Sequence, residues 1–148
     1  MVSMLTGLGT FVCDQFVKSK VENGSLAEGK TFFKDVVQIK PSTNKGFVMN
    51  KGEDKPKIVL VVCSIVFGMA LLMYLGTLGK KHKGVKRFGL GLVLGGAASN
   101  LYDRVKKDGV TDYVSIKGDE RCIFNIGDVA VCLGSIIAAI GEIFSDDE

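Results

Sequence analysis

The side chains of this sequence that could do chemistry include two aspartates, Asp112 and Asp128, while the common nucleophiles lack an activating partner. The only histidine, His82, stands in a basic run and is not placed to activate a serine, and no base accompanies the cysteines. Two carboxyl groups a few ångströms apart cannot both ionise, so such a pair holds one proton and works as acid and base together. If the fold brings the two aspartates together, these residue types indicate aspartic-protease chemistry.

Polar residues elsewhere recur in short blocks. An ionisable group in an apolar helix costs a few kcal/mol, so Asp128 is hard to explain by structure alone, although a place near a helix N-terminus lowers the cost. Asp112 alone can be an ordinary loop carboxylate, and the block at 100–104 can be a helix end with a salt bridge from Asp103. The blocks are Asp14-Gln15-x-x-Lys18, Asn44-x-Gly46, Asn100-x-x-Asp103-Arg104, Val110-x-Asp112-Tyr113 and Phe124-Asn125-x-x-Asp128.

The elements that must position these blocks are long apolar segments. Residues 58–79 carry no charge and no proline, and as a helix they would cover about 30 Å, the thickness of a bilayer's hydrocarbon core. The alternative is the buried central helix of a soluble protein. We predict a mainly α, polytopic membrane protein forming a single domain over 1–148, with four transmembrane helices at about 1–18, 58–79, 86–104 and 123–144. A small extracytoplasmic β-rich cap is expected at about 19–57, between the first two helices.

Composition agrees with this class. Of the 148 residues, 47% are hydrophobic and 24% charged, and mean hydropathy is +0.28, which excludes a disordered chain. A net charge of +3 is too small to indicate nucleic acid as a partner. No Lys or Arg precedes the first apolar run, so we expect it to be retained as a span rather than removed as a signal peptide.

The distribution of charge gives only a weak indication of how the chain is oriented in the membrane. The turn at 80–87 is dense in lysine and free of acids, which favours a cytoplasmic position. The stretch 19–57 is also rich in lysine, so charge alone leaves the choice nearly open.

Small residues suggest how the helices pack. Gly91, Gly95 and Ser99 recur at intervals of four and predict a face for close helix packing, rather than a nucleotide-binding loop. The cysteines form no C-x-x-C pair and predict neither a disulfide framework nor a metal site, so we interpret them as packing residues. They are Cys13, Cys63, Cys122 and Cys132.

The five polar blocks, in this order and spacing, resemble those of the lipoprotein signal peptidase (signal peptidase II) family, and the likeness covers essentially the whole chain. It implies that Asp112 and Asp128 are the catalytic dyad. It implies no cofactor and no metal. The residues that would contact substrate or lipid head group are Asn44, Gly46, Asn100, Arg104 and Asn125, and those in a supporting role are Asp14, Lys18 and Asp103.

The resemblance also implies an activity and a location. The expected enzyme is an intramembrane aspartic endopeptidase that cuts diacylglyceryl-modified prolipoproteins before the lipidated cysteine. Its expected partners are these precursors and membrane phospholipids, and it would be a monomer in the bacterial cytoplasmic membrane with its site on the extracytoplasmic side. The alternative is a non-catalytic lipid- or lipoprotein-binding protein on the same scaffold; a small transporter has less support. Gly127, Tyr113 and the run after Gly46 depart from the family pattern.

Overall fold

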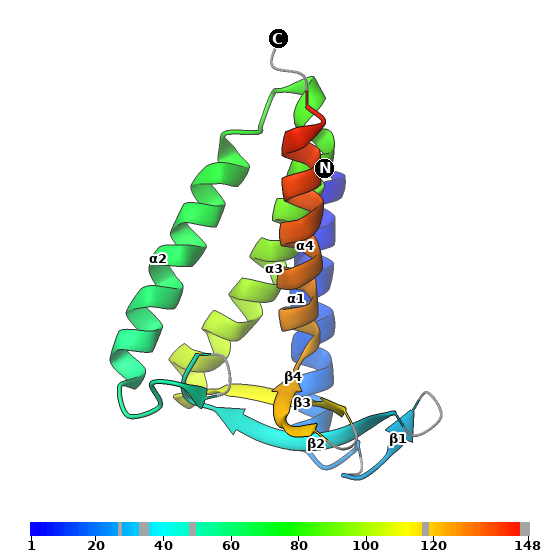
Figure 1. Ribbon diagram of the computed structural model, residues 1–148, viewed down its shortest axis with the longest axis vertical. Helices are drawn as coiled ribbons and strands as arrows, with labels where there is room; N and C mark the ends of the chain where they lie inside the picture. Colours follow the sequence, from blue (N-terminus) through cyan, green and yellow to red (C-terminus); the bar gives the residue numbers. More distant parts are fainter. Residues whose placement is uncertain (27, 33–35, 48–49, 117–118, 146–148) are drawn as a thin grey trace.

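The computed structural model describes residues 1–26, 28–32, 36–47, 50–116 and 119–145. Helices dominate it, and a small antiparallel sheet accompanies them (Figure 1). The helices are α1 (Val2–Glu22), α2 (Pro56–Leu75), α3 (Gly84–Lys107) and α4 (Ile126–Ile143), with a short 3-10 turn, η2 (Lys81–Lys83). The strands are β1 (Thr31–Phe32), β2 (Val37–Asn44), β3 (Val110–Ile116) and β4 (Asp119–Phe124).

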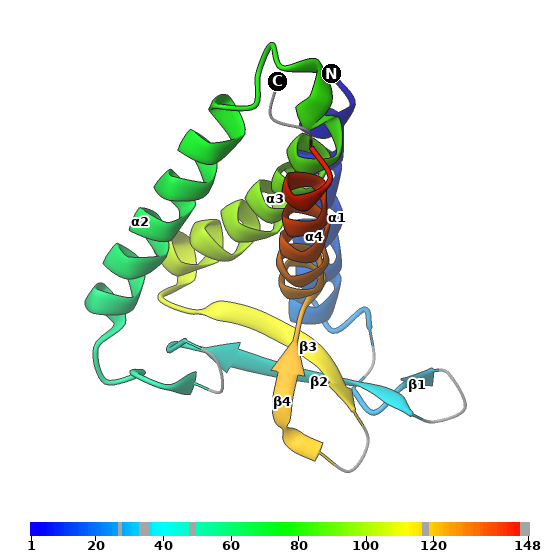
Figure 2. The same ribbon diagram turned by 45° about the horizontal axis from the view of Figure 1, so that its top comes forward.

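The long helices run side by side, and the sheet lies across one end of them (Figures 1 and 2). Helices α1, α3 and α4 pack against one another, whereas α2 contacts α3 and leans away from α4 near the sheet. The turn between α2 and α3, the start of α1 and the end of α4 lie at the opposite end (Figure 1). The polar blocks and the basic turn at 80–87 are therefore at opposite ends of the helices, as the sequence predicts.

The sheet differs from the predicted cap. Its strand order is β1-β2-β3-β4, all antiparallel, so residues 19–57 supply only half of it. Asp112 was expected on a short loop and instead lies in β3, opposite Ser42 of β2. Residues 123–124, expected to open the last span, belong to β4. The β-branched and aromatic residues of Val110–Ile116 favour a strand, but only pairing with the distant β2 makes that preference decisive.

The helix boundaries also differ from the predicted spans. Helix α2 ends at Leu75 with Gly76 as its C-cap, earlier than 79, while α1 extends to Glu22 and α3 to Lys107. In the part of the chain that the structure describes, two helices are long and apolar enough to cross a membrane, α2 and α4. The charges near the ends of α1 and α3 lower their hydropathy. The count of four helices holds for the fold, and the count of four spans is not confirmed by composition.

Helix α1 exposes apolar side chains and buries charged ones, the reverse of the pattern in a soluble protein. Leu5, Leu8 and Phe16 are each 62% exposed, while Asp14 and Lys18 are completely buried. In water the apolar side chains would face inward, because their burial contributes about 25 cal/mol per Å². An apolar exterior around a polar interior is the arrangement that a lipid environment stabilises.

The small-residue prediction for α3 is confirmed. A methyl group on Gly91 would collide with the backbone of Ser3, and one on Gly95 with the backbone of Gly7, so α1 and α3 touch at backbone distance. Glycines on the other side of α3 bring it equally close to α4, where a methyl on Gly89 would meet the backbone of Gly134 and Ala138. These close approaches fix the three helices that carry most of the polar blocks.

Candidate active site

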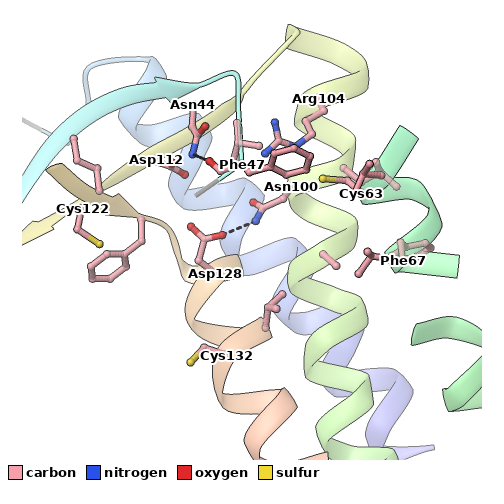
Figure 3. A pocket seen from close by; sticks show the side chains of 18 residues that line it. Asn44, Phe47, Cys63, Phe67, Asn100, Arg104, Asp112, Cys122, Asp128 and Cys132 are labelled. Atoms are coloured by element: carbon pink, nitrogen blue, oxygen red, sulfur yellow. Dashed lines mark hydrogen bonds between the residues drawn. The ribbon is translucent and has the colours of Figure 1, made fainter. Parts of the chain in front are cut away.

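Asp112 and Asp128 reach one site from two different elements (Figure 3). Asp112 lies in β3, is 3% exposed, and is fixed by the pairing of β3 with β2. Asp128 lies in the first turn of α4, where Asn125 is the N-cap. The Asn125 side chain accepts from the Asp128 backbone N–H at 2.8 Å, and the Asp128 carboxylate accepts from the Asn125 backbone N–H at 3.1 Å. This reciprocal capping fixes where α4 begins and how its carboxylate points.

Two asparagine amides connect the two carboxyl groups. Asn125 Nδ2 donates to Asp112 Oδ1 at 2.6 Å and to Asn100 Oδ1 at 3.1 Å. Asn100 Nδ2 in turn donates to Asp128 Oδ1 at 2.8 Å (Figure 3). The residues predicted to form the dyad are thus bridged through Asn125 from one side and through Asn100 from the other, which restricts the positions of both carboxyl groups.

Lys18 fixes the position of one of the two bridging asparagines, Asn100. Its ammonium group is completely buried and pairs with Asp14 at 2.8 Å and Asp103 at 3.0 Å. It also donates to Asn100 Oδ1 at 2.8 Å, so the other end of that amide, the NH₂ group, is directed to Asp128. A buried ammonium is stable only with such partners. The three residues predicted to be supporting therefore form one buried cluster beneath the carboxyl pair.

Three further polar residues join that cluster: Gln15, Ser99 and Tyr113. Ser99 Oγ donates to Asp14 at 2.5 Å, and Gln15 Nε2 donates to Asp103 at 3.0 Å. The Tyr113 hydroxyl donates to Asp14 Oδ1 at 3.2 Å and accepts from the Ile126 backbone N–H at 3.2 Å, so it joins α1 to the first turn of α4. The sequence did not predict these roles. Only for Ser99 did the sequence contain a signal: it lies four residues before Asp103, which places both side chains on the same face of α3.

Asp103 has different partners from those expected. The interpretation as a helix end gave it a salt bridge with a neighbour, whereas its carboxylate accepts from Lys18 and Gln15 of α1 and from the backbone N–H of Thr111. The last of these contacts, at 3.3 Å, connects the end of α3 to β3 at the residue directly before Asp112. Arg104 instead donates to the carbonyl oxygen of Gly46. Asp103 therefore helps to place β3 as well as Lys18.

The β2 end of the site is built by Asn44, Gly46 and Arg104. Arg104 Nη2 donates to the carbonyl oxygen of Gly46 at 2.7 Å, and Asn44 Oδ1 accepts from the Gly46 backbone N–H at 3.0 Å. A methyl group on Gly46 would overlap the backbone of Asn50 and Lys51, so only glycine fits there. The turn after β2 is thereby held against the cavity wall.

Burial changes the acidity of the two titratable groups of β3. Removal from water and the nearby negative charge of Asp128 together raise the pKa of Asp112 to about 7, although hydrogen bonds from Asn125 and Asn44 act to lower it. Burial likewise raises the pKa of Tyr113, whose hydroxyl stays protonated and remains a donor to Asp14. Near neutral pH, Asp112 can therefore keep its proton.

Both carboxyl groups face a cavity of about 580 Å³ (Figure 3). Its polar end contains the predicted site residues Asn44, Asn100, Arg104, Asp112 and Asp128. The rest of its wall is apolar and comes from α2, α3, β4 and α4, with Val62, Val66, Phe67, Phe124 and Val131 among its members. Gly46 and Asn125, which were also predicted to contact the substrate, are not among the residues that line the cavity. Within the described ranges, no group of three or more His, Cys, Asp or Glu side chains is arranged to hold a metal ion.

Solved structures with the same fold place the chain in a class. A bacterial membrane enzyme determined at 2.3 Å aligns with a TM-score of 0.77 and 22% identity, covering 95% of this chain and 87% of that one. A second, determined at 1.9 Å, aligns with a TM-score of 0.73 and 22% identity over 98% and 94% of the two chains. The fold is that of helical bacterial membrane enzymes.

Sequence comparison identifies the family within that class. The chain is 26% identical over 137 residues to the lipoprotein signal peptidase of Caldicellulosiruptor bescii, covering 93% of this chain and 87% of that protein. It is 38% identical over 88 residues to the lipoprotein signal peptidase of Bartonella bacilliformis, a match that spans 51% of that relative. The family model of signal peptidase (SPase) II matches residues 7–144, and the chain belongs to this family of peptidases. The resemblance seen in the polar blocks is confirmed.

Proposed function

We propose that this chain is an intramembrane aspartic endopeptidase that removes signal peptides from diacylglyceryl-modified prolipoproteins, cutting before the lipidated cysteine. The observation that carries the proposal is the pair Asp112 and Asp128, bridged by Asn125 and Asn100 at the polar end of an apolar cavity. The relatives named above are lipoprotein signal peptidases, which supports this substrate class.

The arrangement assigns different states to the two carboxyl groups. Asp128 accepts two N–H groups and lies in the first turn of α4, where the helix dipole favours an anion, so it is the carboxylate of the pair. Asp112 carries the proton, in agreement with its raised pKa. Asp128 then removes a proton from the attacking water while Asp112 donates to the scissile carbonyl oxygen. As the C–N bond breaks, the protonated Asp128 gives its proton to the leaving nitrogen and Asp112 takes back a proton from a hydroxyl of the intermediate, which restores the starting pair.

The cavity suits a substrate with a lipid group next to the cleaved bond. The acyl chains would lie along the apolar wall of Val66, Phe67 and Val131, and the peptide bond would meet the carboxyl pair at the polar end. Because α2 leans away from α4 near the sheet, the cavity wall is shared by two separated helices (Figure 2). A precursor moving within the membrane would enter between them. Arg104 would contact the lipid's polar atoms or the peptide backbone.

The proposed placement in the membrane rests on burial in the helices and on the charge of the turn at 80–87. All four helices would span the bacterial cytoplasmic membrane, α1 and α3 with their polar faces turned inward and their apolar faces to lipid. The basic turn at 80–87 would be cytoplasmic, and the sheet with its carboxyl pair would lie at the extracytoplasmic face, where water for hydrolysis is available.

The decisive experiment is cleavage of a diacylglyceryl-modified precursor by the purified protein in detergent. Asp112→Asn and Asp128→Asn should each abolish cleavage, with the double variant no worse than either single one, because the residues act as a unit. Asp108→Asn is the matched control, since that exposed aspartate ends α3 away from the cavity. Binding of the precursor without cleavage by the wild type would favour the alternative, a lipoprotein-binding protein on this scaffold. Wild-type rates from either single variant would refute the aspartic mechanism.

A further inference from the structure

Three of the four cysteines line the cavity that contains the carboxyl pair. They come from three elements far apart in the sequence: Cys63 from α2, Cys122 from β4 and Cys132 from α4 (Figure 3). All four cysteines are free thiols. The fourth, Cys13, is exposed on α1 and is not part of the cavity wall. Cys13 and Cys132, both exposed, are not the core packing residues that the sequence suggested.

The three thiols are within reach of a molecule in the cavity. Cys132 is exposed, and Cys63 and Cys122 are partly exposed, so no rearrangement of the wall is needed to touch them. A volume of about 580 Å³ lies within the range of small-molecule pockets, about 300–1,000 Å³. The apolar wall favours a hydrocarbon chain. At the other end, Arg104, Asn44 and Asn100 can bind a polar group. The ligand class that fits is an amphiphile with one short polar end.

We propose that Cys63, Cys122 and Cys132 make this cavity a covalent-modification site for long-chain α,β-unsaturated carbonyl compounds, the electrophiles formed when unsaturated lipids oxidise. The thiol sulfur bonds to the β carbon, the π electrons of the C=C bond move to the α carbon, and that carbon takes up the proton lost by sulfur. The carbonyl group is retained, and no oxidant or reductant is consumed. One adduct on any of the three thiols occupies the space that a substrate needs, so the enzyme is blocked irreversibly.

The cavity favours this reaction through proximity. A chain held along the apolar wall keeps its reactive carbon beside one of three sulfurs, which raises the effective concentration of the electrophile. The inhibition depends on the proposed function, because the adduct competes with the acyl chains of the precursor.

Single-thiol proteins provide the test. Four variants each keep one cysteine and have serine at the other three positions, a substitution close in size. Each is treated in detergent with 2-dodecenal, with dodecanal as the matched control that has the same chain but no double bond, and adducts are located by mass spectrometry. After removal of free aldehyde, the forms keeping Cys63, Cys122 or Cys132 should lose cleavage roughly tenfold or more at full modification. The form keeping Cys13 should be modified and stay active.

The outcomes separate this inference from the proposed function. Full modification of the three cavity thiols with undiminished cleavage, or equal inhibition of the Cys13 form, would overturn the inference. If the untreated protein cleaves no precursor, the proposed function fails. A second measurement then tests whether the three thiols line a site that binds the lipid chain. Diacylglyceryl-modified precursor, and not its unlipidated form, should then slow modification of Cys63, Cys122 and Cys132 while leaving Cys13 unchanged. Equal rates with and without the lipidated precursor would overturn the inference on this measurement.

Discussion

Replacing Asp112 by asparagine should remove activity and at the same time stabilise the protein at alkaline pH. An exposed aspartate has a pKa near 3.8, and burial raises that of Asp112 to about 7. This difference of about 3 in pKa corresponds to about 4 kcal/mol of free energy that folding loses once the group is ionised. Asparagine has nearly the shape of the protonated acid and never ionises. Its carbonyl oxygen can still accept from Asn125 Nδ2.

The sign and the pH window follow from the proton count. Between about pH 4 and pH 7 the folded state holds a proton on Asp112 that the unfolded state has lost, so the free energy of unfolding falls as pH rises through this window. Between pH 5 and pH 8 the wild type should lose roughly 2–3 kcal/mol through this group, and Asp112→Asn should not. For a chain of this size that is about 5–10 °C in the midpoint of thermal unfolding.

The assay is the thermal midpoint of both proteins in detergent, followed by far-UV circular dichroism because the chain has no tryptophan. The measured quantity is the gap between variant and wild type, which should be larger at pH 8 than at pH 5. Asp108→Asn serves as the control, because its exposed side chain should leave the gap the same at both pH values. A gap of equal size at pH 5 and pH 8 in Asp112→Asn would show that Asp112 is not a buried, protonated acid.

Three further results are expected. The value of kcat/KM should fall as pH rises above about 7, where Asp112 loses the proton it donates; a profile flat to pH 9 would contradict the assigned roles. Tyr113→Phe removes the hydroxyl that joins Asp14 to the Ile126 N–H, so kcat should fall several-fold with KM little changed, and a change in thermal midpoint alone would mean a purely structural role. Arg104→Lys keeps the charge but loses the fixed geometry toward the Gly46 carbonyl oxygen, so turnover should drop, and full activity would leave Arg104 without a role in binding.

The first turn of α4 shows what the sequence could predict about the site. Asn125-x-x-Asp128 before an apolar run has the spacing of a reciprocal helix cap, and the structure contains that cap. The spacing of Gly91 and Gly95 similarly predicted the close contact with α1. Both features are local or repeat with the helix period, so neighbours in sequence carry the information.

Asp112 and Asp103 show where sequence reasoning failed, since their positions depend on distant partners. The residues of β3 form a strand because β2, about seventy residues earlier, is available to pair with them. Without that pairing partner, residues 110–113 look like a loop after a helix. Asp103 was predicted only to support the site, or to form a salt bridge with a neighbour at the end of its own helix. Its partners instead come from α1 and from the backbone of β3.

The charge balance of the whole cluster explains why the carboxyl pair should hold one proton. Four carboxyl groups, those of Asp14, Asp103, Asp112 and Asp128, lie within one connected network. Two ammonium groups pair with it, the buried Lys18 and the half-exposed Lys107, which contacts Asp103 at 3.2 Å. Lys107 is shared with Glu22, which it contacts at 2.5 Å, so with every acid ionised the network would have at least two more negative than positive charges in a poorly hydrated place. Lys18 and Lys107 already compensate Asp14 and Asp103, so the excess falls on the pair at the cavity, and a proton shared there reduces it at least cost. In the proposed mechanism, the buried cluster would therefore provide helix packing and also maintain a pair with one acid and one base, the state that the proposed peptide hydrolysis requires.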